Sequence, residues 1–226
     1  VYKRQVNTFF YFIGGGYKDF EGLGVEKITS YLKKFGLNNK TGIDLPGERE
    51  GFLPSPEWKE EVKKERWYVG DTYHLAIGQG DILVTPLQVA NFTAMIANGG
   101  TLYKPYLVKK MIDLETGESW EIGEKIVNSG VVSKEHIRTV QQGLRDAVLY
   151  GSARALSSLS VGVAGKTGTA QVGGDADPHA WFTCYAPYNN PEIVITVLIE
   201  NGGEGSTAAL PVARDVLEWY FNREDL

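Results

Sequence analysis

Apolar residues recur every three or four positions through much of the first two-thirds of the chain, which indicates a mainly helical region. The apolar, aromatic stretch 6–13 runs into three glycines at 14–16 and predicts a buried helix with a glycine stop. A second, amphipathic helix ends at Gly36, and its apolar face carries Val25, Ile28, Leu32 and Phe35. Residues 41–59 hold several prolines and glycines and predict a loop with turns.

Two further helices have clear start signals. Thr85 is a good N-cap and Pro86 suits the first helical position. This helix should end before the glycines at 99 and 100, and its close-packing stripe consists of Leu87, Ala90, Ala94 and Ala97. Ser133 caps the other helix, whose apolar face carries Ile137, Val140, Leu144 and Val148. Between them, the runs 103–111 and 119–126 flank a turn at 115–117 and predict a hairpin.

The pattern changes to that of β-strands after residue 153. Strand-like runs cover 161–172, 180–185 and 193–199, and the last is β-branched and expected to be largely buried. A turn at 189–191 joins the last two runs into an antiparallel hairpin. Residues 208–221 form a closing helix, with one side made of Val212, Val216, Trp219 and Tyr220.

This order of elements predicts an α+β fold with helices packed on an antiparallel sheet. The helical part covers about residues 6–150, and the strands with the C-terminal helix cover about residues 155–226. Three central strands are expected.

Composition narrows the classes of function. The 226 residues include 23 basic and 28 acidic side chains, a net charge of −5, so the chain lacks the basic footprint of a nucleic-acid binder. No apolar run approaches the length of a membrane span. The single cysteine, Cys184, lies in an apolar run and reads as a core residue. His74, His136 and His179 lack metal-ligand spacing, and we expect no metal and no organic cofactor.

The most informative segment is Lys166-Thr167-Gly168-Thr169-Ala170-Gln171. A phosphate-binding loop would need a glycine at position 160, where the chain has Ser160, and a helix directly after the lysine. The alternative is a Lys-Thr-Gly strand of a serine acyl-transfer site. On such a strand Lys166 and Gly168 share one face, and Thr167 and Thr169 share the other. A bare glycine lets a ligand approach the strand edge, and the N–H near Thr169 is a candidate oxyanion donor.

Other polar residues have ordinary alternatives. Gly78-Gln79-Gly80 is expected to shape a loop below the site, although a plain turn is equally compatible with the sequence. Asp71 and His74 could form an acid–base pair, but structural hydrogen bonding is the better interpretation because nothing else there supports hydrolysis. His179 could border a substrate groove or have a purely structural role.

Taken together, these motifs resemble the transpeptidase domain of class B penicillin-binding proteins, in particular the elongation-type penicillin-binding protein 2 group. The resemblance covers nearly the whole chain in the order of the family. It rests on the segments 41–46 (TGIDLP), 67–72 (WYVGDT), 77–80 (IGQG), 85–88 (TPLQ), 99–105, 166–171 (KTGTAQ) and 179–182 (HAWF).

The resemblance implies a penicillin-binding-protein/serine β-lactamase-like fold and the motifs Ser-x-x-Lys, Ser-x-Asn and Lys-Thr-Gly. It implies that a serine is acylated by a stem peptide ending in D-Ala-D-Ala, which β-lactams mimic, and that a neighbouring stem then resolves the acyl-enzyme. Asn7 and Lys166 would be catalytic, and Thr167, Gly168 and Thr169 would bind substrate. The implied partners are elongation-complex membrane proteins. The implied location is the outer face of the bacterial cytoplasmic membrane, with an upstream anchor.

The chain departs from the family at the nucleophile. The Ser-x-Asn motif falls on Gln5-Val6-Asn7, and we interpret Gln5, within the unusual start Val1–Gln5, as foreign to the native sequence. The literal Ser30-x-x-Lys33 comes after this motif instead of before it, and Ser30 points away from the apolar helix face. We therefore expect the chain to be a C-terminal fragment whose serine lies upstream, with three of the family's five strands and some sheet surface left uncovered.

Two alternatives stay open at this stage. A D,D-carboxypeptidase or β-lactam-sensing relative would share the Lys-Thr-Gly strand and differ in the acyl acceptor. A catalytically silent binding module is compatible with a chain that holds no Ser-x-x-Lys in the expected position.

Overall fold

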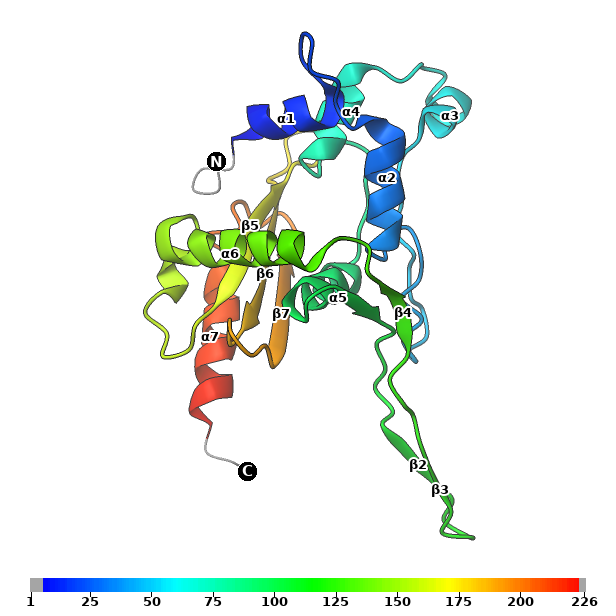
Figure 1. Cartoon of the computed structure of the whole chain (residues 1–226), viewed down its shortest axis with the longest axis vertical. Coiled ribbons are helices and arrows are strands. Elements are labelled where there is room, and N and C mark those ends of the chain that lie inside the picture. The colour runs from blue at the N-terminus through cyan, green and yellow to red at the C-terminus, as the bar shows by residue number, and fades with distance from the viewer. Residues whose placement is uncertain (1–5, 224–226) are drawn as a thin grey trace.

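The computed structural model describes residues 6–223, and it combines helices with a central antiparallel sheet (Figure 1). The predicted α+β class is confirmed. The helices are α1 (Asn7–Gly15), α2 (Gly24–Lys34), α3 (Pro56–Trp58) with the π-helical turn η1 (Lys59–Lys63), α4 (Val69–Ala76), α5 (Pro86–Ala97), α6 (Lys134–Tyr150), the 3₁₀ turn η2 (Arg154–Leu156) and α7 (Ala209–Asn222). The strands are β1 (Thr101–Tyr103), β2 (Lys110–Ile112), β3 (Ser119–Glu121), β4 (Ile126–Ser129), β5 (Ala164–Ala170), β6 (His179–Ala186) and β7 (Ile193–Ile199).

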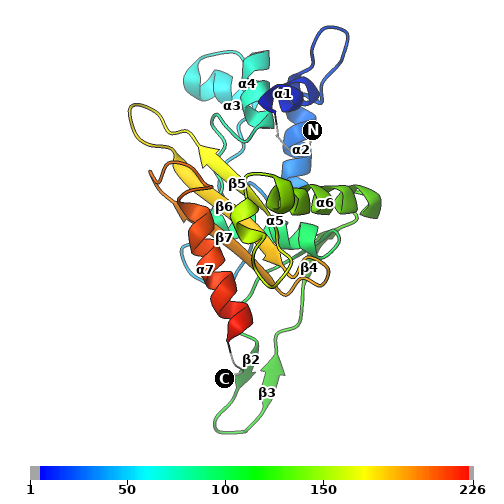
Figure 2. The same cartoon turned by 90° about the vertical axis from the view of Figure 1, so that its left-hand side faces the viewer.

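The central sheet has the order β5-β6-β7, and both pairs are antiparallel, as the sequence predicts. Helix α7 packs on β6 and β7 from one side, α5 lies against the other face, and α6 runs alongside β5 (Figure 2). The register pairs Thr167 with Phe182 and Gly168 with Trp181 without interruption. Directly opposed residues share a face, so β5 presents alternate side chains to the two helical layers.

The main core lies between α7 and the sheet. Its buried members are contributed by α6, the 153–156 segment, β6 and α7. On α7 the buried face consists of Ala209, Leu210, Ala213 and Leu217. The predicted apolar side of this helix was wrong, because Val212, Val216 and Trp219 are exposed while the small residues allow α7 to approach the sheet closely. Strand β7 was expected to be largely buried, and all of its residues are of intermediate burial.

Phe182 is among the largest fully buried side chains of this core, with 1% of its surface exposed. We expect Phe182→Ala to lower the free energy of unfolding by about 3–5 kcal/mol, because the lost burial and the remaining cavity both destabilise the fold. Denaturant unfolding of the chain measures this change. Phe20→Ala is the matched control, since Phe20 is 53% exposed and its loss should have little effect. Equal losses for both variants would contradict this assignment of the core.

In the helical part, α1 packs against α4. A side chain at Gly14 would collide with Ala76, and one at Gly15 would collide with the ring of Tyr73, so the glycines permit the close approach. The hydroxyl of Tyr73 donates to the carbonyl of Gly16 over 2.8 Å. The helix prediction for 6–13 is confirmed, but the predicted burial is wrong, since Phe9 and Phe10 are exposed.

The helix starts read from the sequence are confirmed. The hydroxyl of Thr85 accepts from the N–H of Gln88, and the side-chain oxygen of Gln88 accepts from the N–H of Thr85, which forms a capping box. The amide of Gln88 is also buried and donates to the carbonyls of Asn39 and Glu50, which ties the loop before α3 to α5. Ser133 caps α6 through the N–H of His136.

The hairpin prediction for 103–126 is also confirmed, in two sections. Strand β1 pairs with β4, and farther out β2 pairs with β3, so that the outer hairpin projects from the body of the molecule (Figure 1). The loop prediction for 41–59 is wrong at its end, since residues 56–59 belong to a helical segment that continues to Lys63. Ser55 caps this segment by accepting from the N–H of Trp58.

Across residues 6–223, each helix is too short or too polar to span a bilayer. Within the same residues, His, Cys, Asp and Glu side chains do not gather into a group of three that could bind a metal ion.

Candidate active site

Strand β5 presents the Lys-Thr-Gly residues on two faces. Lys166 and Gly168 lie opposite Thr183 and Trp181, on the face toward α5, where Thr183 hydrogen-bonds Thr93. Thr167 lies opposite Phe182, on the α7 face. The alternation expected for these residues from the sequence is therefore observed.

Lys166 is half-buried, and this burial lowers the pKa of its ammonium group from the ordinary lysine value. The ammonium group donates a hydrogen bond to the carbonyl of Thr167. A partly desolvated cation of this kind is suited to bind an anionic group of a ligand, because opposite charges attract more strongly where water is excluded.

The two glycines at the centre of the site allow a tight backbone crossing. A side chain at Gly205, in the turn before α7, would come within less than 3.0 Å of the carbonyl oxygens of Trp181 and Gly168. Gly168 faces the other way, where an added methyl group would lie 3.1 Å from Trp181 Cβ. The N–H of Gly205 also donates to the hydroxyl of Thr169 over 3.5 Å. The 205 turn thus supports the strand from behind.

Thr167 has a partner that the sequence reasoning missed. Its hydroxyl lies 2.7 Å from the hydroxyl of Ser152, which follows the C-terminal end of α6. Ala153 and Leu156, which follow Ser152, belong to the α7-side core together with Val148 of α6. Ser152 therefore lies where the end of α6 joins this core beside β5. The only signal in the sequence was a Gly-Ser-Ala turn, which does not indicate its neighbour.

Asn7 is exposed and begins α1. Among residues 6–223, no hydrogen bond joins Asn7 to Lys166 on the Lys-Thr-Gly strand. Gln5, the residue at the serine position of the motif, lies outside the described residues. The position of Asn7 depends on α1, and α1 is held by its packing on α4.

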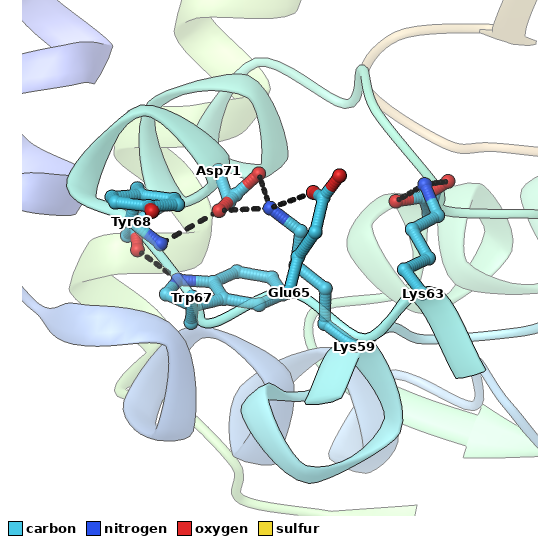
Figure 3. A network of polar contacts seen from close by, with 8 residues as sticks. Lys59, Lys63, Glu65, Trp67, Tyr68 and Asp71 are labelled. Carbon is cyan, nitrogen blue, oxygen red and sulfur yellow. Dashed lines mark hydrogen bonds and ion pairs between the residues drawn. The ribbon is translucent and has the colours of Figure 1, made fainter. Parts of the chain in front are cut away.

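Helix α4 is itself anchored by a network of charged side chains (Figure 3). The ammonium group of Lys59 contacts both carboxylate oxygens of Asp71 at 2.9 and 2.8 Å, and Glu65 lies 3.5 Å away. Asp71 also accepts from the N–H of Tyr68 over 2.7 Å. Burial opposes the ionisation of Asp71, but the hydrogen bonds from Lys59 and Tyr68 outweigh it and lower its pKa. The structural role expected for Asp71 is supported.

Gln79 connects α4 to the Lys-Thr-Gly strand. Its side-chain nitrogen donates to the carbonyl of Thr169 over 2.9 Å, and its side-chain oxygen accepts from the N–H of Gln171 over 3.3 Å. The expectation that residues 78–80 shape a loop below the site is consistent with these contacts. The direct bonds of Gln79 to the strand could not be read from the sequence.

The remaining candidates are peripheral. Ser30 is exposed on α2, as its position on the helical wheel predicts. It borders an open groove with a volume of about 440 Å³ together with residues from α2 and the start of α3. His179 accepts at Nδ1 from the N–H of Asn201 over 3.0 Å, which is a structural contact.

Comparison with known proteins identifies the class. The family model described as "Penicillin binding protein transpeptidase domain" matches residues 6–218. The peptidoglycan D,D-transpeptidase MrdA of Haemophilus influenzae is 35% identical over 217 residues, which cover 89% of this chain and 33% of the relative. The chain therefore belongs to the penicillin-binding protein transpeptidase family.

Solved structures point to the type within that family. Penicillin-binding protein 2 of Pseudomonas aeruginosa, solved in complex with WCK 5153, has a TM-score of 0.81 at 33% identity and covers 96% of this chain and 47% of its own. Penicillin-binding protein 2 of Helicobacter pylori, solved in complex with MreC, has a TM-score of 0.76 at 32% identity, with coverages of 96% and 38%. Within the family, the chain is therefore of the class B type that includes penicillin-binding protein 2 and MrdA.

Proposed function

We propose that the full-length protein is a peptidoglycan D,D-transpeptidase and that residues 1–226 form the C-terminal part of its single transpeptidase domain. The observation that carries this proposal is β5, where a half-buried lysine of lowered pKa stands beside two threonines and a glycine. The family match and the MrdA relative support the reaction class.

The residues have distinct roles in this reaction. The terminal carboxylate of a D-Ala-D-Ala stem peptide lies at the edge of β5, where the ammonium group of Lys166 reaches it from one face and the hydroxyls of Thr167 and Thr169 reach it from the other. Gly168 leaves room for the peptide backbone, and the N–H of Thr169 stabilises the oxyanion. Asn7 hydrogen-bonds the substrate from the opposite wall.

The nucleophile is a serine encoded before Asn7. Its oxygen bonds to the penultimate D-alanine carbonyl, and the terminal D-alanine leaves with its amine protonated. The amine of a neighbouring stem then attacks the ester, forms the cross-link and releases the serine. β-Lactams acylate the same serine.

The location and partners follow from the same proposal. The protein acts at the outer face of the cytoplasmic membrane, anchored by a segment that precedes this chain, and works with membrane proteins of the elongation complex. The MreC complex of the H. pylori relative supports the choice of partner class.

Labelling with a fluorescent penicillin tests the function. We expect the full-length protein to be labelled on a serine of a Ser-x-x-Lys motif that precedes Asn7, and the 226-residue chain alone to stay unlabelled. Peptide mass spectrometry locates the acylated residue, and Ser30→Ala is the control that should leave labelling of the full-length protein unchanged. Label on Ser30 would refute the assignment. Competition between amine acceptors and water then separates a transpeptidase from a carboxypeptidase.

A further inference from the structure

The outer edge of β5 is where the polar contacts of this site meet. In an antiparallel ladder, alternate residues direct both backbone groups toward the partner strand, and the residues between them direct both groups away. The carbonyls of Val163, Thr167 and Thr169 accept from side chains of Arg145, Lys166 and Gln79 respectively. Positions 167 and 169 differ by two and the register with β6 is regular from Ala164 to Ala170, so both carbonyls point to the edge away from β6. The carbonyl of Val163, directly before the strand, is held by Arg145.

Gln79 acts on this edge as a substitute for a strand residue. A single amide group binds the C=O of Thr169 and the N–H of Gln171, at 2.9 and 3.3 Å. One residue of a parallel strand would bind the same two groups. The ladder with β6 ends at the pair formed by Ala170 and His179, so Gln79 holds the backbone at the point where β6 stops supporting it.

The local backbone directs Gln79 toward the strand. The glycines on both sides have positive φ angles, +74° at Gly78 and +85° at Gly80, in the left-handed region that other residues rarely adopt. The N–H of Gln79 bonds the carbonyl of His74 over 2.9 Å, which fixes the turn to the end of α4. Helix α4 is in turn held to α1 and to Lys59.

We propose that Gln79 is a positioning residue for the acyl-transfer reaction, which sets the N–H of Thr169 against the reacting carbonyl. This inference rests on the proposed function, in which that N–H is the oxyanion donor. Gln79 holds the carbonyl of the same residue, and a shift of the Thr169 backbone would turn its N–H from the oxyanion. Through α4 and α1 the same side chain joins the strand to the wall that carries Asn7.

The test uses the full-length protein and the second-order rate of acylation by a fluorescent penicillin. We expect Gln79→Ala to lower this rate about tenfold or more, because a misplacement of about 1 Å can cost up to 100-fold. Gln141→Ala is the matched control, because the side-chain amide of Gln141 likewise makes two bonds to backbone, to the carbonyls of Ile96 and Ala97, but on α5. We expect Gln141→Ala to lower the stability of the fold and to leave the acylation rate at its wild-type value.

A Gln79→Glu variant separates positioning from a general loss of stability. A protonated carboxyl group supplies one donor and one acceptor and can replace both bonds of the amide, whereas the ionised form has no donor and repels the Thr169 carbonyl. The rate of this variant relative to wild type should therefore rise as the pH falls from 8 toward the ordinary glutamate pKa of about 4.3. Gln79→Ala should show no such recovery.

The outcomes distinguish the two proposals. A labelled wild type together with a Gln79→Ala variant within twofold of its rate would overturn the role of Gln79 alone, and so would a Gln79→Glu ratio that does not change with pH. A wild-type protein that takes no penicillin would overturn the proposed function and this inference with it. Faster amide hydrogen exchange at Gln171 in Gln79→Ala, with unchanged exchange at Phe182, would support the loss of a local clamp.

Discussion

Lys166→Ala is expected to lower the rate of penicillin acylation of the full-length protein by at least about 100-fold, since the proposed charge-assisted contact to the ligand carboxylate and its orienting effect would be lost together. The half-buried position of the ammonium group makes the contact stronger than one at a fully solvated surface. Stopped-flow or gel-based labelling measures the rate. Lys33→Ala, in the exposed Ser30-x-x-Lys33 segment, is the control and should acylate normally.

The lowered pKa of Lys166 adds a pH signature to this prediction. Burial favours the neutral amine, so Lys166 loses its proton at a lower pH than an ordinary lysine. Acylation should therefore decline on the alkaline side before the usual lysine range near 10.5 is reached. The stability of the fold changes with pH in the opposite direction. Because the native state releases this proton more readily than the unfolded chain, the free energy of unfolding rises with pH between the native-state and unfolded-state pKa values of Lys166. If the acylation rate of the wild type declined at alkaline pH in the same way as that of Lys166→Ala, the assignment would be contradicted.

Gly205→Ala is expected to damage both the fold and the site. The added methyl group would meet the backbone oxygens of Trp181 and Gly168 at less than 3.0 Å, and backbone cannot move aside as a side chain can. We expect a loss of about 1–3 kcal/mol in unfolding free energy, in the range of overpacked interiors. We also expect penicillin labelling to fall at temperatures where the variant is still folded.

The control for this substitution is Gly123→Ala. Gly123 has no neighbour within 4 Å of an added methyl group and is not among the glycines with positive φ, so the change should be neutral or slightly stabilising. Thermal unfolding and labelling on the same preparations check both variants. A Gly205→Ala protein with wild-type labelling would show that the 205 turn does not support β5.

The sequence predicted the strands and the helix starts because their signals are local. Thr85 and Pro86, the serine at 133 and the β-branched run 193–199 determine backbone geometry within a few residues, and each prediction holds in the structure. The Lys-Thr-Gly strand was predicted equally well, since the alternation of Lys166 and Thr167 between the two faces follows from strand geometry alone.

The errors arose where a helix face had to be assigned to a partner. Helix α7 carries apolar residues on more than one side, and the small Ala209 and Ala213 allow close contact with the sheet while Val212 and Trp219 point outward. Hydrophobicity alone favoured the larger residues. For α1, aromatic composition suggested burial, but only Gly14 is buried within the helix.

Contacts between segments distant in sequence could not be predicted at all. Ser152 contacts Thr167 over a sequence separation of 15 residues, and Gln79 contacts Thr169 over a separation of 90. A single sequence holds no local signal for such pairs, whereas the tertiary fold determines them.

The side chains along the outer edge of β5 have a consequence for solubility. An unpaired strand edge is a template on which another copy of the protein can add a strand, and such pairing leads to aggregation. Here Arg145, Lys166 and Gln79 occupy the carbonyls on which a long invading strand would depend, and two of the three carry positive charge. A short peptide that brings its own carboxylate can compete locally for this edge, while a neutral strand from a neighbouring molecule would have to displace all three side chains.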